Sequence, residues 1–265
     1  MIKWPLIVLL LLTISASSRA GIGQVTEQIN SPATIQRKND TLQGIKGQPV
    51  EMSDSIRTQQ GKVGITFEDD TRVQVNENSK LVIDDFVYDP KSKSGKLGAK
   101  IALGTVRYAS GQIAKSTPQN VALTTPTATI SVRGTDFTAT VEEIGQSTII
   151  LLPSCPDDKP SRNKDDIANN CKVGEIIVES DAGQVILNQP FQATRVESRS
   201  SNPTRPVILN LSEDAIGNML ILSPPKELKD NKQSNIAQKS YLDVDFLAAT
   251  GLENALDKKI GRAHV

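Results

Sequence analysis

The chain has 265 residues, and its 30 Lys and Arg residues balance 30 Asp and Glu residues. This balance provides no basic footprint for nucleic acid or for an anionic membrane surface. Aromatic residues make up only 3% of the chain, which argues against stacking platforms for bases or sugars. The only histidine, His264, is the penultimate residue, so histidine-based catalysis is not expected.

The first twenty residues have the three parts of a secretory signal. Lys3 supplies a positive charge, the run from Leu6 to Leu12 is apolar, and Ser18-Arg19-Ala20 offers a cleavage site after a small residue. The apolar run is shorter than the roughly 20 residues of a membrane-spanning helix. We therefore expect a signal peptide over residues 1–20, cleaved after Ala20, and a periplasmic or secreted protein without a stable membrane span. An uncleaved anchor is the alternative.

Two cysteines enclose a polar segment in the second half of the chain. Cys155 and Cys171 are separated by fifteen residues, of which only Ile167 and Ala168 are aliphatic. In an oxidising compartment, such a pair predicts a disulfide, and closing a loop of this size contributes roughly 3 kcal/mol in the chain-entropy model. Free thiols are one alternative. The aspartates of the loop lack the ligand spacing of an EF-hand, and we expect no metal and no cofactor.

Between residues 21 and 211, apolar and polar residues alternate in short runs, which is typical of half-buried strands. The clearest pair flanks the polar turn Glu68-Asp69-Asp70 and predicts a hairpin, with Val63 and Ile65 before the turn and Val73 after it. Further strands are expected at residues 81–88, 100–103, 105–109, 120–123, 127–132, 137–141, 148–152, 175–179, 184–187, 192–196 and 207–211. We predict an all-β domain over residues 21–211, an antiparallel β-sandwich or β-roll, with solenoid-like stacking as a variant.

The remainder of the chain has a different pattern. Residues 213–222 are expected to form a short helix that Pro224-Pro225 ends, and residues 226–239 are polar enough for a linker. The spacing of Leu242, Phe246, Leu252 and Leu256 fits either a short amphipathic helix or a disordered tail. We predict that residues 212–259 form this helix, linker and tail.

The last six residues are expected to be an artefact of sequencing. The codons ATC-GGA-AGA-GCA-CAC-GTC would encode residues 260–265, which resembles read-through into a sequencing adapter. The alternative is an ordinary frayed C-terminus. These residues are left out of the fold prediction.

The most informative segment is residues 125–137, TPTATISVRGTDF. Three pieces precede it in order: a strand, acidic turn and strand over residues 61–71, a small polar residue before an aliphatic strand at 78–83, and a glycine-bounded strand at 104–111. Together with a glycine-containing strand pair that ends near Gly183, these pieces resemble the FecR-domain family. The resemblance extends over about residues 48–196.

The resemblance implies a binding or signalling role and no catalysis. Members best known for signalling resemble membrane-spanning regulators that hold a sigma factor in the cytoplasm and sense an outer-membrane receptor during iron-siderophore uptake. Here only five residues, Met1, Ile2 and Lys3 followed by Trp4 and Pro5, precede the apolar run, so direct contact with a sigma factor is not expected. The chain looks like the exported stand-alone relatives, with an unidentified protein partner.

The signature is expected to have a structural role first. Pro126 keeps Thr125 extended, and Gly134 allows a corner that a residue with a Cβ would resist. Arg133 is expected to fork onto carbonyls or onto Asp136 and so tie two strand ends together. The alternative is a surface for a ligand or partner, and the candidate site comprises Thr125, Pro126, Arg133, Gly134, Thr135 and Asp136.

No arrangement of acids points to an enzyme. Asp69-Asp70 and Asp84-Asp85 are adjacent pairs, and neighbouring side chains on a strand point to opposite faces, which is wrong for a carboxylate pair. The sequence therefore predicts an exported, non-catalytic FecR-like protein, a periplasmic binding or signal-perception module. The alternative is a structural or surface-assembly protein of a bacterial envelope or a phage virion.

Overall fold

The computed structural model describes residues 21–155, 167 and 169–211. The expected signal peptide, most of the loop between the two cysteines, and the expected C-terminal helix, linker and tail lie outside the described residues.

Strands form most of the described chain, and the all-β prediction is confirmed. In chain order the strands are β1 (Gly23–Asn30), β2 (Ala33–Arg37), β3 (Asp40–Gly44), β4 (Pro49–Val50), β5 (Ser55–Arg57), β6 (Gly61–Phe67), β7 (Arg72–Val75), β8 (Lys80–Asp89), β9 (Ser94–Ala109), β10 (Val121–Thr124), β11 (Thr129–Arg133), β12 (Asp136–Val141), β13 (Ser147–Leu152), β14 (Glu175–Ser180), β15 (Gly183–Leu187), β16 (Gln192–Val196) and β17 (Val207–Ile208). Between β9 and β10 lie the short helix α1 (Gln112–Ser116) and the 3₁₀ turn η1 (Pro118–Asn120).

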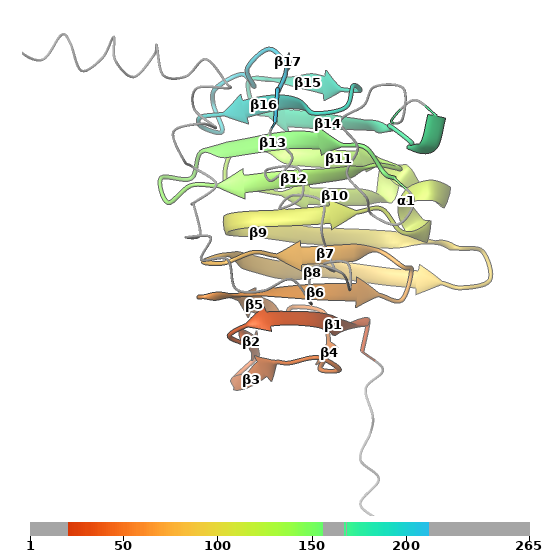
Figure 1. The fold of residues 1–265 in the computed structure, drawn as a ribbon, viewed down its shortest axis with the longest axis vertical. Coiled ribbons are helices and arrows are strands. Elements are labelled where there is room, and N and C mark those ends of the chain that lie inside the picture. Colours follow the sequence, from red (N-terminus) through yellow and green to blue (C-terminus); the bar gives the residue numbers. More distant parts are fainter. Residues whose placement is uncertain (1–20, 156–166, 168, 212–265) are drawn as a thin grey trace, which may run out of the picture.

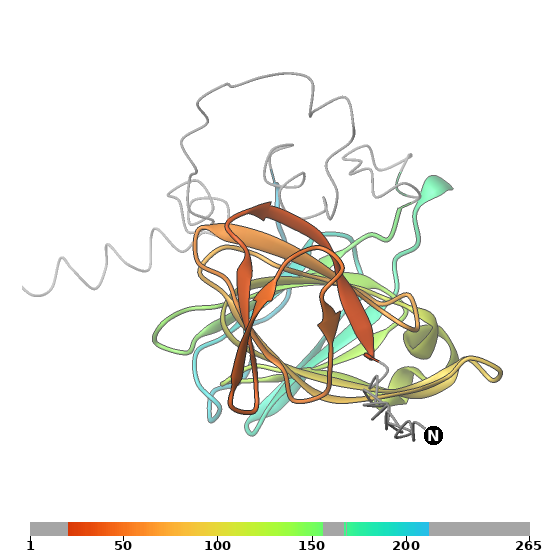
Figure 2. The ribbon, with the colours of Figure 1, turned by 90° about the horizontal axis from the view of Figure 1, so that it is seen from below.

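The strand pairings form two rows. Row A runs β4-β1-β6-β7-β9-β12-β13-β16-β17. Row B runs β3-β2-β5-β8-β9-β10-β11-β14-β15. Every neighbouring pair is antiparallel except β9 with β10, which is parallel. The strands are stacked along the long axis of the molecule, and the view along that axis shows them wrapping around a common interior (Figures 1 and 2).

Strand β9 belongs to both rows and joins them into one body. Its first part pairs with β8 and β10 in row B, and its second part pairs with β7 and β12 in row A. The change occurs at Gly104, whose φ is 75°. A Cβ at this position would lie 2.6 Å from the Cα of Ser79, so both the backbone conformation and the close approach require glycine.

The chain beyond β9 places successive hairpins in alternate rows. Hairpin β10–β11 lies in row B, β12–β13 in row A, β14–β15 in row B and β16–β17 in row A. The side chains that point inward from both rows form the main core. This arrangement explains the alternating sequence pattern, because each strand presents one face to the core and the other to solvent.

The structure differs from the predicted strands in three places. The strand expected at residues 207–211 covers only β17, Val207–Ile208. The two strands expected at residues 100–103 and 105–109 form one strand, β9, because Gly104 bends the chain without ending the pairing. The five strands from β1 to β5 had no individual prediction. In β1 the register with β6 shifts between Val25 and Glu27, and this irregularity breaks the alternation that marks a strand in sequence.

A second, smaller apolar cluster covers the outer face of row A near its C-terminal end. Its buried members are Ile150, Leu152, Ile167, Phe191, Ala193, Leu209 and Leu211. The predicted disulfide is confirmed: Cys155 is bonded to Cys171, and the half-buried Cys171 packs against this cluster. The disulfide therefore links the segment that follows β13 to the segment that precedes β14. In the part of the chain described, no helix is long and apolar enough to cross a membrane.

Candidate functional site: the signature corner

The signature begins in a hydrogen-bonded turn between β10 and β11. The Thr125 hydroxyl accepts a bond from the backbone N–H of Ala128 at 2.9 Å, and the Thr125 N–H donates to the Ala128 carbonyl at 2.8 Å. Ser147, at the start of β13, donates to the Thr125 hydroxyl and accepts from the Thr127 hydroxyl. Both threonines are buried and Pro126 is exposed. These residues therefore connect the turn in row B to row A.

The corner between β11 and β12 carries the chain from row B to row A. Gly134 has a φ of 62°, which is a left-handed conformation. The nearest atom to a Cβ there would be the Ala114 carbonyl oxygen, 4.0 Å away, so glycine is favoured by the backbone angle and not by lack of space. Gly174 differs, because a Cβ at that position would lie 2.9 Å from the Cβ of Thr135 and would overlap the Arg133 carbonyl.

Arg133 does not contact Asp136, so that expectation was wrong. Its side chain is 61% exposed, and its Nη1 lies 3.1 Å from Oε1 of Glu175, the residue opposite it on β14. The reason is the alternation along β11: Val132 points into the core, so Arg133 points outward from row B. Asp136 begins a strand of the other row and is buried.

The partner of Asp136 is Arg107 on β9. Nη2 of Arg107 lies 3.2 Å from Oδ2 of Asp136, and the two side chains are 2% and 5% exposed. Asp136 also accepts hydrogen bonds from the N–H of Ser110 and the hydroxyl of Ser154. Arg107 was not singled out from the sequence. The available signal was a single arginine inside the otherwise uncharged strand segment from Gly104 to Ala109.

A second buried carboxylate lies in the acidic turn that follows β6. Asp69 accepts hydrogen bonds from the N–H of Thr71 at 3.0 Å, the hydroxyl of Thr71 at 2.8 Å and the N–H of Ile113 at 3.1 Å. Its own carbonyl accepts from the N–H of Gln112. Asp69 therefore attaches α1 to the β6–β7 turn, a structural role that its place in an acidic turn did not suggest.

Tyr108 lies between these two carboxylates. It is fully buried, its hydroxyl is next to the side chains of Thr71 and Ser110, and its ring stacks on Phe137 with 5.3 Å between centroids. Burial, with smaller contributions from the charges of Asp69 and Asp136, raises the pKa of Tyr108 well above its ordinary value. The interior of the corner thus contains a tyrosine that stays protonated and two carboxylates that already have several donors.

The arrangement is suited to holding strands together. Both carboxylates accept hydrogen bonds from neighbouring strands or from α1, and the described residues contain no group of three His, Cys, Asp or Glu side chains that could hold a metal ion. The signature residues are thus divided between an interior network and the outward-facing Arg133. The structure brings Thr135 and Asp136 into the interior, and leaves Pro126 and Arg133 at the surface.

Residues 54–152 match the family described as FecR protein. The matched segment begins just before β5 and ends with β13. The match is narrower than the resemblance expected over residues 48–196. The two rows of strands continue beyond it at both ends.

Two crystal structures of a "putative anti-sigma factor" from Parabacteroides distasonis ATCC 8503 are similar to the chain. The sequence identities are 13% and 12%, and each comparison has a TM-score of 0.38. Each covers 57% of this chain, and the chain spans 57% of the length of each of these proteins. The sequence matches none of the curated proteins.

Proposed function

We propose that this chain is an exported, non-catalytic FecR-domain protein that binds a protein partner and takes part in signal perception outside the cytoplasm. The observation that carries the proposal is the FecR domain over residues 54–152. Export is proposed from the signal-like residues 1–20, and the disulfide between Cys155 and Cys171 is consistent with an oxidising compartment.

The division of the signature residues supports binding at the surface. Asp136, Thr125 and Thr127 are buried and hydrogen-bonded, which leaves them no free groups for a partner. Arg133 is exposed on the outer face of row B, and its ion-pair partner among the described residues, Glu175, is itself 31% exposed. A surface ion pair of this kind contributes little to stability. Arg133 can therefore leave Glu175 and pair with a carboxylate of a partner.

The experiment that tests the proposal combines localisation with crosslinking in the native cells. The full-length chain, carrying a photo-crosslinking amino acid in place of Arg133, is expected in the extracytoplasmic fraction with Gly21 as its first residue. Light should attach it to one discrete protein. The control carries the same amino acid at Lys38, an exposed residue of the β2–β3 turn at the other end of the stack.

Recovery from the cytosol with residues 1–20 intact would overturn export. An identical crosslinking pattern from both positions would show that the face bearing Arg133 has no specific partner.

A further inference from the structure

Strand β15 is an edge strand of row B that lacks the usual protection against pairing. Natural edge strands are kept short or carry charges, prolines or bulges. Of the other end strands, β4 and β17 have two residues each, with Pro49 in the first and Pro206 just before the second, and β3 begins with the exposed Asp40. β15 has five residues, Gly183–Leu187, without charge or proline, and its register with β14 is regular.

The backbone of β15 presents unused hydrogen-bonding groups along this edge. β14 and β15 are joined by the two-residue turn Asp181-Ala182, so Ser180 and Gly183 form a hydrogen-bonded pair. Because such pairs alternate along an antiparallel ladder, Gln184 and Ile186 point their N–H and C=O groups away from β14. Within the described residues, these outward groups make no hydrogen bond to another segment.

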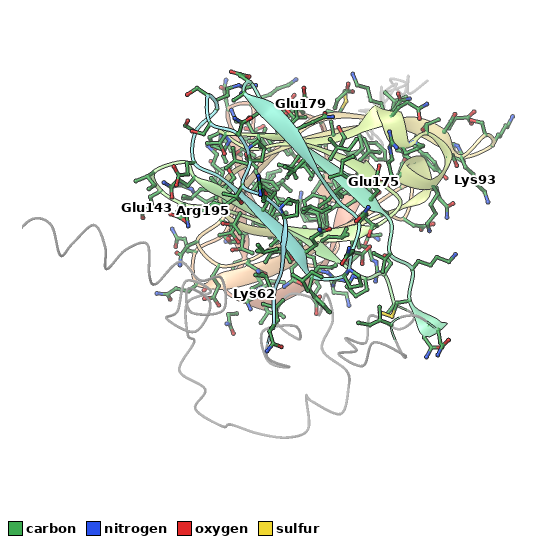
Figure 3. All side chains as sticks on the ribbon, turned by 90° about the horizontal axis from the view of Figure 1, so that it is seen from above. Lys62, Lys93, Glu143, Glu175, Glu179 and Arg195 are labelled. Carbon is green, nitrogen blue, oxygen red and sulfur yellow. A yellow bond between two sulfur atoms is a disulfide. The ribbon has the colours of Figure 1, made fainter. Side chains whose placement is uncertain are left out.

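The side chains beside this edge are apolar and acidic. Ile186 is 44% exposed and lies opposite the half-buried Ile177 of β14, so the two form an apolar pair on the outer face. Gln184 lies opposite Glu179, which is exposed and makes no ion pair within the described part of the chain. Glu175 and Glu179 lie along β14 at the end of the stack (Figure 3).

We propose that the β15 edge binds an extended segment of a partner protein by strand addition. The backbone of the incoming segment pairs with Gln184 and Ile186, as in other complexes in which a peptide extends a sheet. An aliphatic side chain or stem covers Ile186, and a lysine or arginine reaches Glu179. The proposal specifies how the protein partner of the proposed function is held, and to that extent rests on it.

A second copy of this chain fits the edge less well. Five residues of edge strand bury far less than the roughly 1,200 Å² of a stable dimer interface. A two-fold pairing of β15 with itself would also bring the Glu179 side chains of both copies toward one seam, with no basic residue on β14 or β15 to neutralise them. A peptide strand needs no such area and can carry the complementary charge.

The test measures binding of a defined probe to the purified mature protein. The probe is a fluorescent seven-residue peptide that alternates valine with lysine, followed by anisotropy. The control peptide has the same sequence with N-methyl groups on alternate amides, which removes the donors that face β15. We expect saturable binding of the probe below about 1 mM and at least about tenfold weaker binding of the N-methylated peptide.

A pair of matched variants places the binding on β15. Ile186→Pro removes an N–H that faces away from β14, so the β14–β15 ladder keeps its bonds. Gln43→Pro makes the same change at the equivalent position of β3, the other five-residue edge strand, which also follows a two-residue turn. Ile186→Pro should weaken probe binding at least about tenfold, and Gln43→Pro should leave it unchanged. If Ile186→Pro does not fold, Ile186→Lys is used in its place and the N-methylated peptide still reports on backbone pairing.

Several results would overturn the proposal. Absence of binding, or equal binding by the Ile186 variant, would show that the edge does not accept a strand. Binding that appears only after residues 212–265 are removed would assign the edge to the chain's own C-terminal segment. A dimer in sedimentation that Ile186→Pro dissociates would assign it to a second copy. These measurements use purified protein, so they are independent of localisation and of the crosslinking result.

Discussion

Arg107 and Asp136 form an ion pair in the interior, where removing one member takes the opposite charge away from the other. Each is almost fully buried, and the pair joins β9 to β12. Breaking a buried pair of this kind is costly, whereas replacing both members with apolar residues is often neutral. The pair is therefore expected to hold the FecR signature in place more strongly than the exposed Arg133.

Asp136→Ala should lower the free energy of unfolding by about 3 kcal/mol, because it breaks a buried ion pair on one side only. Urea unfolding of the mature protein measures the change. The double variant Arg107→Met, Asp136→Leu should recover most of the loss. Arg133→Ala, the matched surface control, should change stability by less than about 1 kcal/mol. Equal losses for Asp136→Ala and Arg133→Ala would refute the buried-pair interpretation.

The corner at Gly134 is held by its backbone angle. Because φ is 62° and a Cβ there would meet no close atom, Gly134→Val should destabilise the protein through conformation alone, by roughly 1–2 kcal/mol. Gly134→Asn should cost less, since asparagine tolerates the left-handed region. Thermal melting of both variants measures the difference. Equal melting temperatures for the valine and asparagine variants would contradict this explanation.

Tyr108 makes stability sensitive to alkaline pH. Burial raises the pKa of Tyr108 in the folded state above the ordinary value of 10.0 that it has when unfolded. The contribution of Tyr108 to the free energy of unfolding is therefore fully present below pH 10. It is lost as the pH rises above 10, because the tyrosine ionises more readily in the unfolded chain than in the folded protein. Tyr108→Phe should flatten the fall in unfolding free energy above pH 10, measured by urea titration. Tyr88, at a half-buried site, also has a raised pKa but a smaller shift, so Tyr88→Phe should flatten the fall less than Tyr108→Phe.

At the scale of elements, the sequence predicted strands where the alternation is regular and failed where it is not. Hairpin β6–β7 was predicted because Val63, Ile65 and Val73 alternate with polar residues on either side of an acidic turn. β1 was not, because its register shift interrupts the alternation. The direction of Arg133 could have been derived from the same alternation, since Val132 must point inward. The pairing of Arg107 with Asp136 could not, because it depends on which strands of the two rows become neighbours.

The disulfide is a side-chain crosslink between the successive hairpins β12–β13 and β14–β15. Cys155 follows β13 and Cys171 precedes β14, so the bond holds together the connection from row A to row B. The double variant Cys155→Ser, Cys171→Ser should have a free energy of unfolding about 3 kcal/mol lower than that of the native protein, as the loop length predicts. Addition of reductant should destabilise the native protein and leave the double variant unchanged. If reductant makes both thiols reactive but does not lower the free energy of unfolding of the native protein, this role is contradicted.

At the scale of the whole molecule, the strands outside the matched FecR segment belong to the same folded body. Arg37 of β2 donates two hydrogen bonds to Asp54, at 2.8 and 2.7 Å, and the Asp54 side chain is fully buried. β1 pairs along the whole length of β6. A chain that begins at residue 48 would leave Asp54 without this arginine and β6 as an open edge. The FecR segment is therefore the middle of a longer stack.

The most direct test compares the unfolding of residues 21–211 with that of residues 48–196. We expect the longer fragment to give a strand-dominated far-ultraviolet spectrum and a single cooperative transition. Hydrogen exchange should show β1 and β16 protected together with β9 and β12, because β9 joins the two rows. The shorter fragment should be less stable by at least the cost of one broken buried pair, about 3 kcal/mol. Equal stability of the two fragments, or separate transitions within residues 21–211, would contradict a single two-row stack.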